Sequence, residues 1–333
     1  MIKYTSLLLL LFLISCTDPD TPPQKTQKQI TDFVDAYYTS SQYETDDQGR
    51  VSLLRAVKGT ALPYVGLECP TLQRPYIAHG ELVFTNQPNA NFKLLDRQND
   101  DPYSLPEEQT IVFRKMPGTD WEAIISGWGN YYLGFAGIND VRAVRPDLYF
   151  GMKVPVKYYE LGFFHVRYDR ESDGRGKAKL WFNGDYYGEV VSPDDSWSRR
   201  LGYGVGIETN STDFNWVATM STERGMTDAE RNEYFEAVKN TYSVGTIPDL
   251  PYASDINIVE SNGKLTAAYA YHGTTSEDKT KTEFQWWQLS PDLANQKMIG
   301  TDANIPVQPD VKVCVKVYDT QGRSWMFISG NYR

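Results

Sequence analysis

Short β-type runs separated by turn-forming residues restrict the fold of this chain more than any other sequence feature. From about Gln29 to Gly245, apolar and aromatic runs end repeatedly at Gly, Pro, Asn or Asp. Runs with these boundaries are typical of antiparallel strands. The clearest of them are 110–114, 123–126, 131–135 and 162–168. The pattern predicts an all-β domain.

Two glycine-containing turns join the last of these runs to two more predicted strands. A turn at 173–176 leads into 177–182, and Asn183-Gly184 follows before 186–190. Asn-Gly is the preferred pair for a two-residue type I′ turn, because both residues must adopt a positive φ. We therefore expect three consecutive antiparallel strands.

One segment has helical rather than β spacing. Residues 226–238 place apolar side chains three and four positions apart. Thr227 is a candidate N-cap, and Glu230 lies three residues further on, which completes the capping-box pattern. One short helix is expected at the end of the β domain.

A second set of β-type runs follows a segment that contains two prolines. Pro248 and Pro251 lie in 246–252 and cannot donate backbone hydrogen bonds to a sheet, so we expect an exposed linker that proteases cut first. The β-type runs beyond it are 264–271, 284–289, 311–318 and 325–329. Residues 253–333 therefore form a candidate second β domain.

Two details of this second region predict which side chains are buried. The run 311–318 alternates, with its valines on one face and its lysines and Cys314 on the other. Trp286 and Trp287 are adjacent in a strand, so one should be buried and the other should face out. The region resembles a small immunoglobulin-like sandwich, and that resemblance implies a core tryptophan in 284–289.

The N-terminus has the pattern of a secretion signal. Residues 1–15 contain one early lysine and the apolar run 7–14, which is too short to cross a bilayer as a helix. The sequence up to Cys16 resembles the bacterial lipobox, which implies lipid attachment at Cys16. Residues 16–34 then read as a polar, proline-containing tether. Acidic residues after Cys16 resemble the surface-export signal of Bacteroidota lipoproteins, which implies an outer-membrane protein at the cell surface.

Charge and cysteine usage narrow the range of partners. The formal net charge is −10, and nucleic-acid binding draws on clustered Lys and Arg, so nucleic acid is not an expected partner. Cys69 and Cys314 are far apart in the sequence, and we interpret both as buried free thiols. The three histidines, His79, His165 and His272, do not cluster. Each is interpreted as a hydrogen-bonded structural residue, and no cofactor or zinc site is expected.

The ordered motifs resemble a known group of β domains. Residues 179–184 resemble the hairpin of laminin-G-like and concanavalin A-like jelly rolls, and 225–230 resemble the element that closes bacterial members. Residues 47–52, 74–75 and 80–84 resemble the opening strands in the same order. The resemblance spans 35–245 and implies a jelly-roll sandwich. It departs from the group at 216–220, where members often have an acidic strand that helps to bind calcium.

Jelly rolls of this kind include hydrolases, lyases and lectins, so the fold alone does not decide the function. A retaining glycosidase needs two carboxylates about 5 to 5.5 Å apart, and no candidate strand has that spacing. The pairs Glu107-Glu108 and Asp194-Asp195 lie near prolines and are interpreted as solvated turn or edge charges. No G-x-S-x-G motif is present either. Catalysis is therefore disfavoured, although a hydrolase or lyase stays an alternative.

The abundance of aromatic residues favours binding. The chain has 8 Trp and 23 Tyr, and such rings stack on the apolar faces of sugars. For any one of these aromatics, burial in the sandwich core is the competing interpretation. Trp197 is the first choice for an exposed platform because charged and hydroxyl side chains surround it. The candidate carbohydrate-binding residues are Trp197, Asp195, Trp128, Tyr131, Asp185 and Tyr187. A protein-binding adhesin or a purely structural role is the other open alternative.

Overall fold

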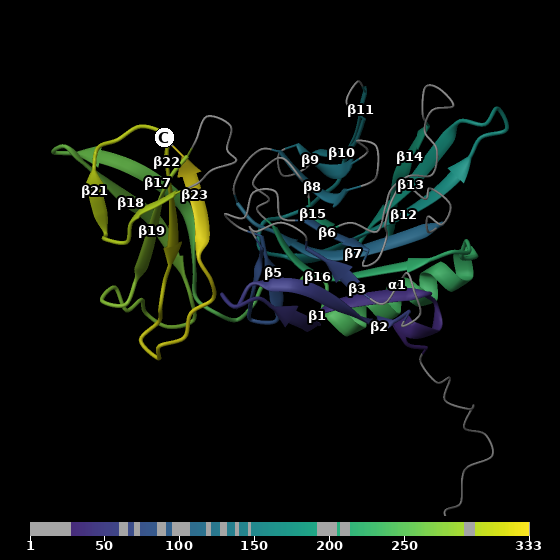
Figure 1. Cartoon of the computed structure of the whole chain (residues 1–333), viewed down its shortest axis with the longest axis horizontal. Helices are drawn as coiled ribbons and strands as arrows, with labels where there is room; N and C mark the ends of the chain where they lie inside the picture. The colour runs from purple at the N-terminus through teal and green to yellow at the C-terminus, as the bar shows by residue number, and fades with distance from the viewer. Residues whose placement is uncertain are drawn as a thin grey trace, which may run out of the picture.

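The computed structural model describes residues 28–59, 66–69, 74–84, 91–94, 107–117, 121–126, 132–136, 140–145, 148–191, 205–206, 214–289 and 297–332. Antiparallel strands dominate these residues, and they contain one α-helix. The strands form two sandwiches side by side along the long axis of the molecule (Figure 1). The predicted all-β sandwich fold with one short helix is confirmed.

The largest sheet has twelve strands and forms the centre of the first sandwich. In order across the sheet, ten of them are β14 (Asp185–Val191), β13 (Gly176–Phe182), β12 (Leu161–Arg170), β7 (Glu108–Lys115), β16 (Phe214–Thr222), β1 (Ala36–Thr45), β2 (Val51–Lys58), β3 (Gly66–Glu68), β6 (Asn91–Leu94) and β15 (Val205–Gly206). The remaining two, β4 (Tyr76–Ala78) and β5 (Glu81–Val83), pair with each other, and β5 also pairs with β16. The first and last strands of the sandwich, β1 and β16, are therefore neighbours.

A smaller sheet covers one face of the largest sheet, and the helix covers the other (Figure 1). The smaller sheet has the strands β11 (Leu148–Lys153), β10 (Asp140–Arg145), β9 (Tyr132–Ala136) and β8 (Trp121–Ser126), in that order. Successive side chains of β7 point to opposite faces of the sheet, as strand geometry requires. Ile111 and Phe113 belong to the interior core, whereas Val112 belongs to the core beneath the helix.

The predicted hairpin and helix are both confirmed. Asn183 and Gly184 have φ angles of 51° and 92°, as a type I′ turn requires, and they join β13 to β14. Helix α1 (Asp228–Tyr242) begins after Thr227, whose hydroxyl accepts a hydrogen bond from the Glu230 amide. The Glu230 carboxylate in turn accepts from the Thr227 amide at 2.9 Å, which completes the capping box.

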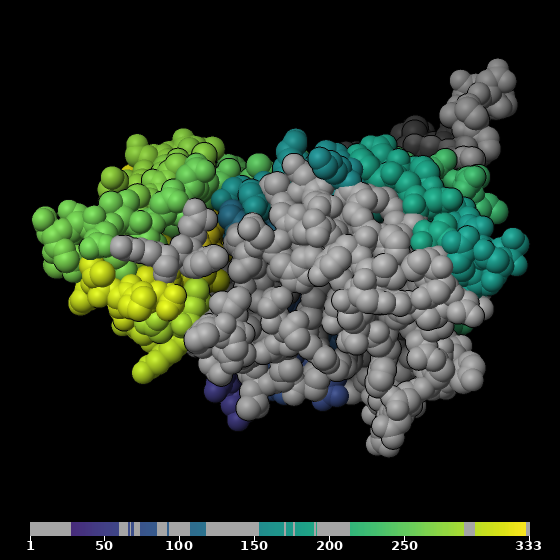
Figure 2. Space-filling view, turned by 90° about the horizontal axis from the view of Figure 1, so that it is seen from above, coloured from purple at the N-terminus to yellow at the C-terminus, as the bar shows by residue number. Residues whose placement is uncertain are grey.

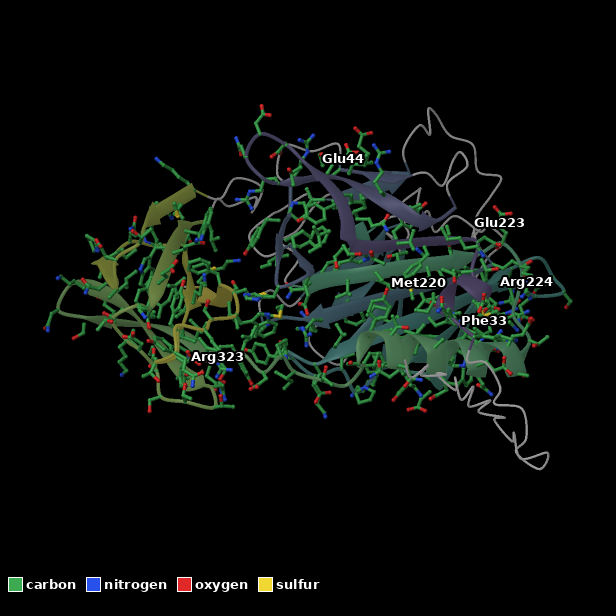
Figure 3. All side chains as sticks on the ribbon, turned by 90° about the horizontal axis from the view of Figure 1, so that it is seen from below. Phe33, Glu44, Met220, Glu223, Arg224 and Arg323 are labelled. Carbon is green, nitrogen blue, oxygen red and sulfur yellow. The ribbon has the colours of Figure 1, made fainter. Side chains whose placement is uncertain are left out.

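The N-terminal end of the described chain packs against this helix. The short 3₁₀ helix η1 (Ile30–Asp32) precedes Phe33, whose ring centre lies 5.7 Å from that of Tyr234. Lys28 forms an ion pair with Glu233 at 2.9 Å. Figure 3 shows Phe33 beside the helix, seen from below. The chain therefore enters the first sandwich on its helical side.

The second sandwich has two small sheets. One contains β17 (Tyr252–Ser261), β18 (Lys264–His272) and β21 (Asn304–Pro306), and the other contains β20 (Lys297–Gly300), β19 (Glu283–Gln288), β22 (Val311–Lys316) and β23 (Ile328–Tyr332). The valines of β22 and Trp286 lie in its core, as predicted, while Trp287 is half-buried on the opposite face. The strand predicted at 325–329 begins only at Ile328, because Trp325 packs into the junction between the sandwiches.

The junction between the sandwiches is buried and polar at its centre. Arg114 of β7 forms an ion pair with Glu81 of β5 at 2.7 Å, and its guanidinium lies 5.3 Å from the centre of the Trp325 ring. The same side chain donates to the Thr246 carbonyl at 2.9 Å. The Tyr159 ring lies 4.7 Å from that of Tyr252 across the boundary. One hydrophobic cluster therefore contains residues of both sandwiches.

Backbone hydrogen bonds hold the connection between the sandwiches at both ends. The Gly245 amide donates to the Leu161 carbonyl at 2.7 Å, and the Trp325 amide donates to the Pro251 carbonyl at 3.1 Å. Ile247 between them is 42% exposed. The expected linker is therefore exposed in part but anchored to both neighbours, which opposes the local opening that proteolysis requires.

The alternation predicted for β22 is present, yet its second face is also buried. Cys314 is fully buried beside Tyr76 of the first sandwich, and Lys312 is 4% exposed. Cys69 lies in the core of the first sandwich. Both cysteines are buried thiols that do not form a disulfide with each other, as interpreted from the sequence.

Candidate functional site

Most of the predicted site lies outside the described residues. Cys16, Trp128, Tyr131, Asp195 and Trp197 all fall in ranges that the structure does not describe. They stay predictions. The two described members of the set, Asp185 and Tyr187, both lie on β14, at the end of the molecule opposite the second sandwich (Figure 2).

The hairpin β13–β14 places its aromatic rings on opposite faces. Tyr187 is half-buried on the interior side, with its ring centre 6.4 Å from that of Phe182. Tyr186 lies on the helical side, 5.2 Å from Trp181, and is 52% exposed. Asp185 is exposed next to the turn. The exposed ring of this pair is therefore Tyr186, which the sequence-based choice of Tyr187 missed.

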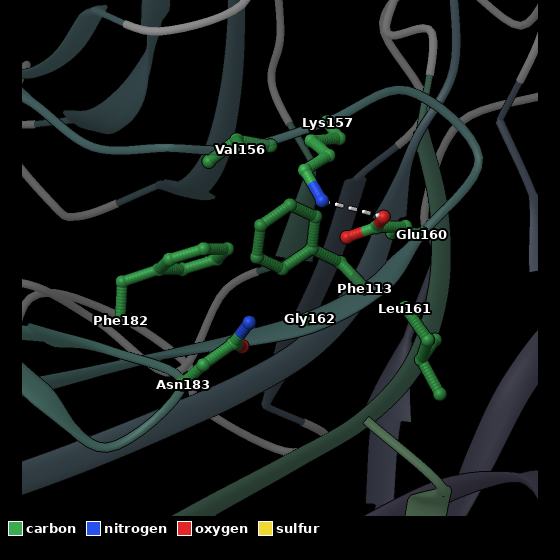
Figure 4. Close-up of a pocket in the computed structure, with 8 residues that line it drawn as sticks. All are labelled: Phe113, Val156, Lys157, Glu160, Leu161, Gly162, Phe182 and Asn183. Carbon is green, nitrogen blue, oxygen red and sulfur yellow. Dashed lines mark hydrogen bonds and ion pairs between the residues drawn. The ribbon is translucent and has the colours of Figure 1, made fainter. Parts of the chain in front are cut away.

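A small cavity opens on the interior side of the same hairpin (Figure 4). Its volume is only about 10 Å³, enough for a single water molecule. The rings of Phe113 and Phe182 form its apolar wall, and the side chain of Asn183 lies beside them. Because Phe182 also contacts Tyr187, the cavity adjoins the described part of the predicted site.

Charged side chains lie at the rim of this cavity. Lys157 and Glu160 form an ion pair at 2.9 Å, and Figure 4 shows it above the aromatic rings. Lys157 is 69% exposed, so this ion pair is open to solvent and contributes little to stability.

The turn geometry fixes the orientation of the Asn183 side chain. Its Oδ1 accepts a hydrogen bond from the Phe163 amide at 2.9 Å, so the amide group is held with Nδ2 on the other side. Gly162 permits this close packing, since a Cβ there would lie 3.0 Å from the Phe182 ring and 3.2 Å from Asn183 Oδ1. The cavity thus combines two aromatic rings, an oriented amide and an ion pair.

The opposite face of the hairpin has a different polar environment. The Arg231 guanidinium lies 4.8 Å from the centre of the Trp181 ring, beneath the half-exposed indole. Further along the hairpin, Lys177 lies between Glu171 at 2.7 Å and Glu189 at 3.7 Å. Tyr186 therefore projects from a surface of alternating charge, with Trp181 beside it.

Glu108 contradicts the sequence-based interpretation of Glu107-Glu108 as solvated charges. Its side chain is fully buried between β7 and α1. It accepts hydrogen bonds from Arg231 at 2.9 and 3.3 Å, from His165 Nε2 at 2.9 Å and from the Met226 amide at 2.7 Å. Four donors satisfy the carboxylate, which explains how a charge is tolerated there. The sequence did contain a signal for this burial. Side chains alternate between the two faces of a strand, so Glu108 lies on the same helical face as Val112.

Burial and charge set the ionisation of this buried cluster. Burial alone would raise the pKa of Glu108, but hydrogen bonds from His165 and Arg231 outweigh it and hold the pKa at about 2. Burial lowers the pKa of His165, and the nearby charges of Arg231 and Arg167 act in the same direction. His165 is therefore neutral, and its Nδ1 lies 2.8 Å from the Thr110 hydroxyl. The cluster is structural, since solvent does not reach it.

The other two histidines are also hydrogen-bonded, as predicted. His79 Nε2 lies 2.6 Å from the Trp325 carbonyl oxygen, and His272 Nε2 lies 2.7 Å from the Ser254 hydroxyl. Among the described residues, no group of three or more His, Cys, Asp or Glu side chains converges as a metal-binding set. Within the same residues, no helix is long and apolar enough to cross a membrane.

Comparisons with known proteins find only remote structural similarity. No protein-family model and no curated protein matches the chain. The binding domain of botulinum neurotoxin serotype D/C is similar over 91% of this chain and 79% of that chain, with a TM-score of 0.42 and 8% identity. The receptor-binding domain of botulinum neurotoxin type G is similar over 89% of this chain and 91% of that chain, with a TM-score of 0.43 and 10% identity.

An enzyme structure is similar to the same low degree. Trypanosoma rangeli sialidase in complex with sialic acid has a TM-score of 0.45 and 8% identity, over 63% of this chain. This chain spans about a third of the sialidase chain, 33%. Identities and TM-scores as low as these do not identify a family or an activity.

Proposed function

We propose that the protein is a lipid-anchored cell-envelope protein whose first sandwich binds carbohydrate without catalysing a reaction on it. The proposed binding site is the exposed end of the β13–β14 hairpin, which includes Asp185 and Tyr187. Trp128, Tyr131, Asp195 and Trp197 are proposed as further members of the same binding surface. Cys16 provides the lipid anchor, and the surface-exposed outer membrane is the proposed location.

The exposed end of the β13–β14 hairpin supports this proposal more than any other observation. Tyr186 is 52% exposed, so much of its ring is open to the CH face of a sugar. The exposed Asp185, Asn183 Nδ2 and the Lys157–Glu160 pair offer acceptors and donors for hydroxyl groups.

The carboxylates around the hairpin support binding rather than hydrolysis. A glycosidase needs two carboxyl groups flanking the scissile bond. Of the eight residues that line the cavity, Glu160 is the one carboxylate, and it is paired with Lys157. The buried carboxylates Glu81 and Glu108 are each enclosed in ion pairs away from the cavity. This arrangement favours binding of a sugar over hydrolysis of its glycosidic bond.

A glycan array probed with the full-length protein in a non-carbohydrate detergent tests this function. Asn183→Asp keeps the acceptor for the Phe163 amide but removes the Nδ2 donor, so it should weaken binding about tenfold, as loss of a ligand hydrogen bond does. Lys157→Met should weaken binding to a similar degree. The matched control is Lys281→Met, which breaks a similarly exposed pair with Asp278 in the second sandwich.

Two outcomes would reject the proposed function. Absence of binding to every glycan would leave a protein ligand or a structural role. Release of reducing sugar or of an unsaturated uronide from a polysaccharide, abolished by changing one carboxylate, would make the protein an enzyme.

A further inference from the structure

The helical face of the β13–β14 hairpin has an exposed aromatic ring among charged side chains. Tyr186 is 52% exposed, and its ring centre lies 5.2 Å from that of Trp181. The Trp181 indole is half-buried and packs on the Arg231 guanidinium, which lies 4.8 Å from the ring centre. Tyr186 and Trp181, called the platform below, are thus supported from beneath, and a ligand can stack on Tyr186 directly from solvent.

A carboxylate lies next to this ring on the same face. In the register of the hairpin, Tyr186 pairs with Trp181 and Glu189 pairs with Lys179. Trp181 and Lys179 are two residues apart on β13, so all four side chains share the helical face. Glu189 is 43% exposed. Burial and then the charge of Glu189 raise the pKa of the Tyr186 hydroxyl, so the field of the carboxylate reaches the ring.

The described cations around the platform are all paired with carboxylates of the chain itself. Lys177 is the ion-pair partner of Glu189 at 3.7 Å, but it lies closer to Glu171, at 2.7 Å. Two carboxylates thus share one ammonium, and the excess charge beside Tyr186 is negative. The other pairs on this face are Lys179–Asp169, Arg167–Asp169, Arg231–Glu108 and Lys239–Glu236.

We infer that the platform selects uncharged glycans and that Glu189 is the residue that excludes acidic ones. This inference rests on the proposed function, because it takes the exposed hairpin end as the carbohydrate site. It adds the class of the ligand and a specificity-determining residue. The sugar stacks on Tyr186 and lies beside the Glu189 carboxylate on the helical face.

The charge of the ligand decides what it meets at Glu189. Hydroxyl groups of an uncharged sugar can donate hydrogen bonds to the carboxylate. A uronic acid places a second negative charge there, and two like charges about 4 Å apart reduce affinity about fivefold even in water. Among the described residues of this face, every cation that could offset that repulsion is already paired. The net charge of −10 acts in the same direction.

Matched oligosaccharides that differ only in charge test the inference. Calorimetry on the full-length protein would compare mannohexaose with hexamannuronate of the same linkage, cellohexaose with its C6-carboxylate form, and methyl-esterified with free hexagalacturonate. In each pair that binds, the uncharged member should bind at least about fivefold more tightly at low salt. Glu189→Gln should reduce this ratio of affinities. About 0.5 M NaCl should reduce it too, because the screening length falls to a few ångströms.

Two further variants separate the platform from the rest of the surface. Tyr186→Ala should weaken binding of the uncharged member about tenfold to a hundredfold, by analogy with base–aromatic stacking. Glu44→Gln removes a similarly exposed carboxylate, 52% exposed on β1, and should leave the ratio unchanged. Equal or tighter binding of the acidic members, or a preference that persists in Glu189→Gln, would overturn the inference while the proposed function stands. Absence of binding to these pairs and to every glycan of the array would reject both.

Discussion

The Glu108 carboxylate and the Arg231 guanidinium form a buried ion pair, 2.9 Å apart, between the centre of the largest sheet and the only α-helix of the described chain. Arg231 also donates to Asp228 at 2.7 Å and to the Met226 carbonyl at 2.8 Å. The pair thus holds the N-terminal turn of α1 on β7. Replacing either partner alone by a neutral side chain leaves the other charge buried where water does not reach it.

Arg231→Met should therefore be strongly destabilising. The variant leaves Glu108 buried without its main cationic partner, and such a loss costs about 3–5 kcal/mol. Urea unfolding followed by far-UV circular dichroism measures it. Arg224→Met is the matched control, because Arg224 pairs with Glu230 at the surface of the same region and should cost less than about 1 kcal/mol. Equal effects of both variants would contradict a special role for the buried pair.

Stability should fall as the pH drops below about 6.5. Burial lowers the pKa of His165 in the folded protein, whereas the unfolded side chain has its ordinary value of 6.5. Below that pH the unfolded state binds a proton that the folded state resists, so the free energy of unfolding decreases with a slope of up to about 1.4 kcal/mol per pH unit. Urea midpoints at pH 7.5 and 5.5 measure the effect. His165→Gln should reduce the difference, and an unchanged difference would assign it to other groups.

Gln109→Leu should stabilise the protein. Both polar atoms of the Gln109 amide are buried and have no hydrogen-bond partner among the described residues. Removing an unsatisfied buried amide while keeping its volume should raise the free energy of unfolding by about 1 kcal/mol. Thr110→Val on the same strand is the contrast. The Thr110 hydroxyl accepts a hydrogen bond from Tyr234 at 2.7 Å, so its loss should cost about 1–3 kcal/mol. A loss of stability in both would show that the Gln109 amide has a partner.

Arg114→Met should separate the unfolding of the two sandwiches. Arg114 contacts Glu81, Thr246 and Trp325, so its loss weakens the junction and leaves a buried carboxylate, at a cost of about 3–5 kcal/mol. In scanning calorimetry we expect one transition for the wild type and two for the variant. Cleavage between residues 245 and 252 should become faster in the variant as well. Arg55→Met, which breaks an exposed pair with Glu44, should leave a single transition.

Cys16→Ala should abolish lipid attachment. The thiol of Cys16 is the acylation site that the lipobox resemblance implies, so the variant precursor should stay unprocessed and unlabelled by radioactive palmitate. Partition between detergent and water phases measures the anchor. If the variant enters the detergent phase like the wild type, the anchor is wrong.

The fold was predictable where local rules dominate. The pair Asn183-Gly184 specifies a type I′ turn, and Thr227 with Glu230 specifies the start of the helix, because each motif is complete within a few residues. Alternation in β22 likewise predicted the buried valines. The same rule could not show that Lys312 and Cys314 are buried too, since Cys314 lies beside Tyr76 of the first sandwich, far away in the sequence. Burial of a second face depends on packing between distant segments.

The site was less predictable for the same reason. Composition and turn residues pointed to the hairpin. Whether Tyr186 or Tyr187 is the more exposed depends on what covers each face of the largest sheet, which the sequence does not show. Glu108 was misread because its partners Arg231 and His165 lie more than fifty positions away in the sequence. Phe113, Lys157 and Asn183 meet at the cavity only after β7, β12 and β13 pair.

The contact of Lys28 with Glu233 has a mechanical consequence. The described chain enters beside α1, and the hairpin lies at the same end of the long axis, away from the second sandwich (Figure 1). A pulling force between an anchored N-terminus and a carbohydrate held at the hairpin would run through β1, β16, β7, β12 and β13. The ladders of β7–β12 and β12–β13 each pair seven residues in register. The second sandwich would lie outside that line of tension, so it would stay folded and in place while the first sandwich bears the strain.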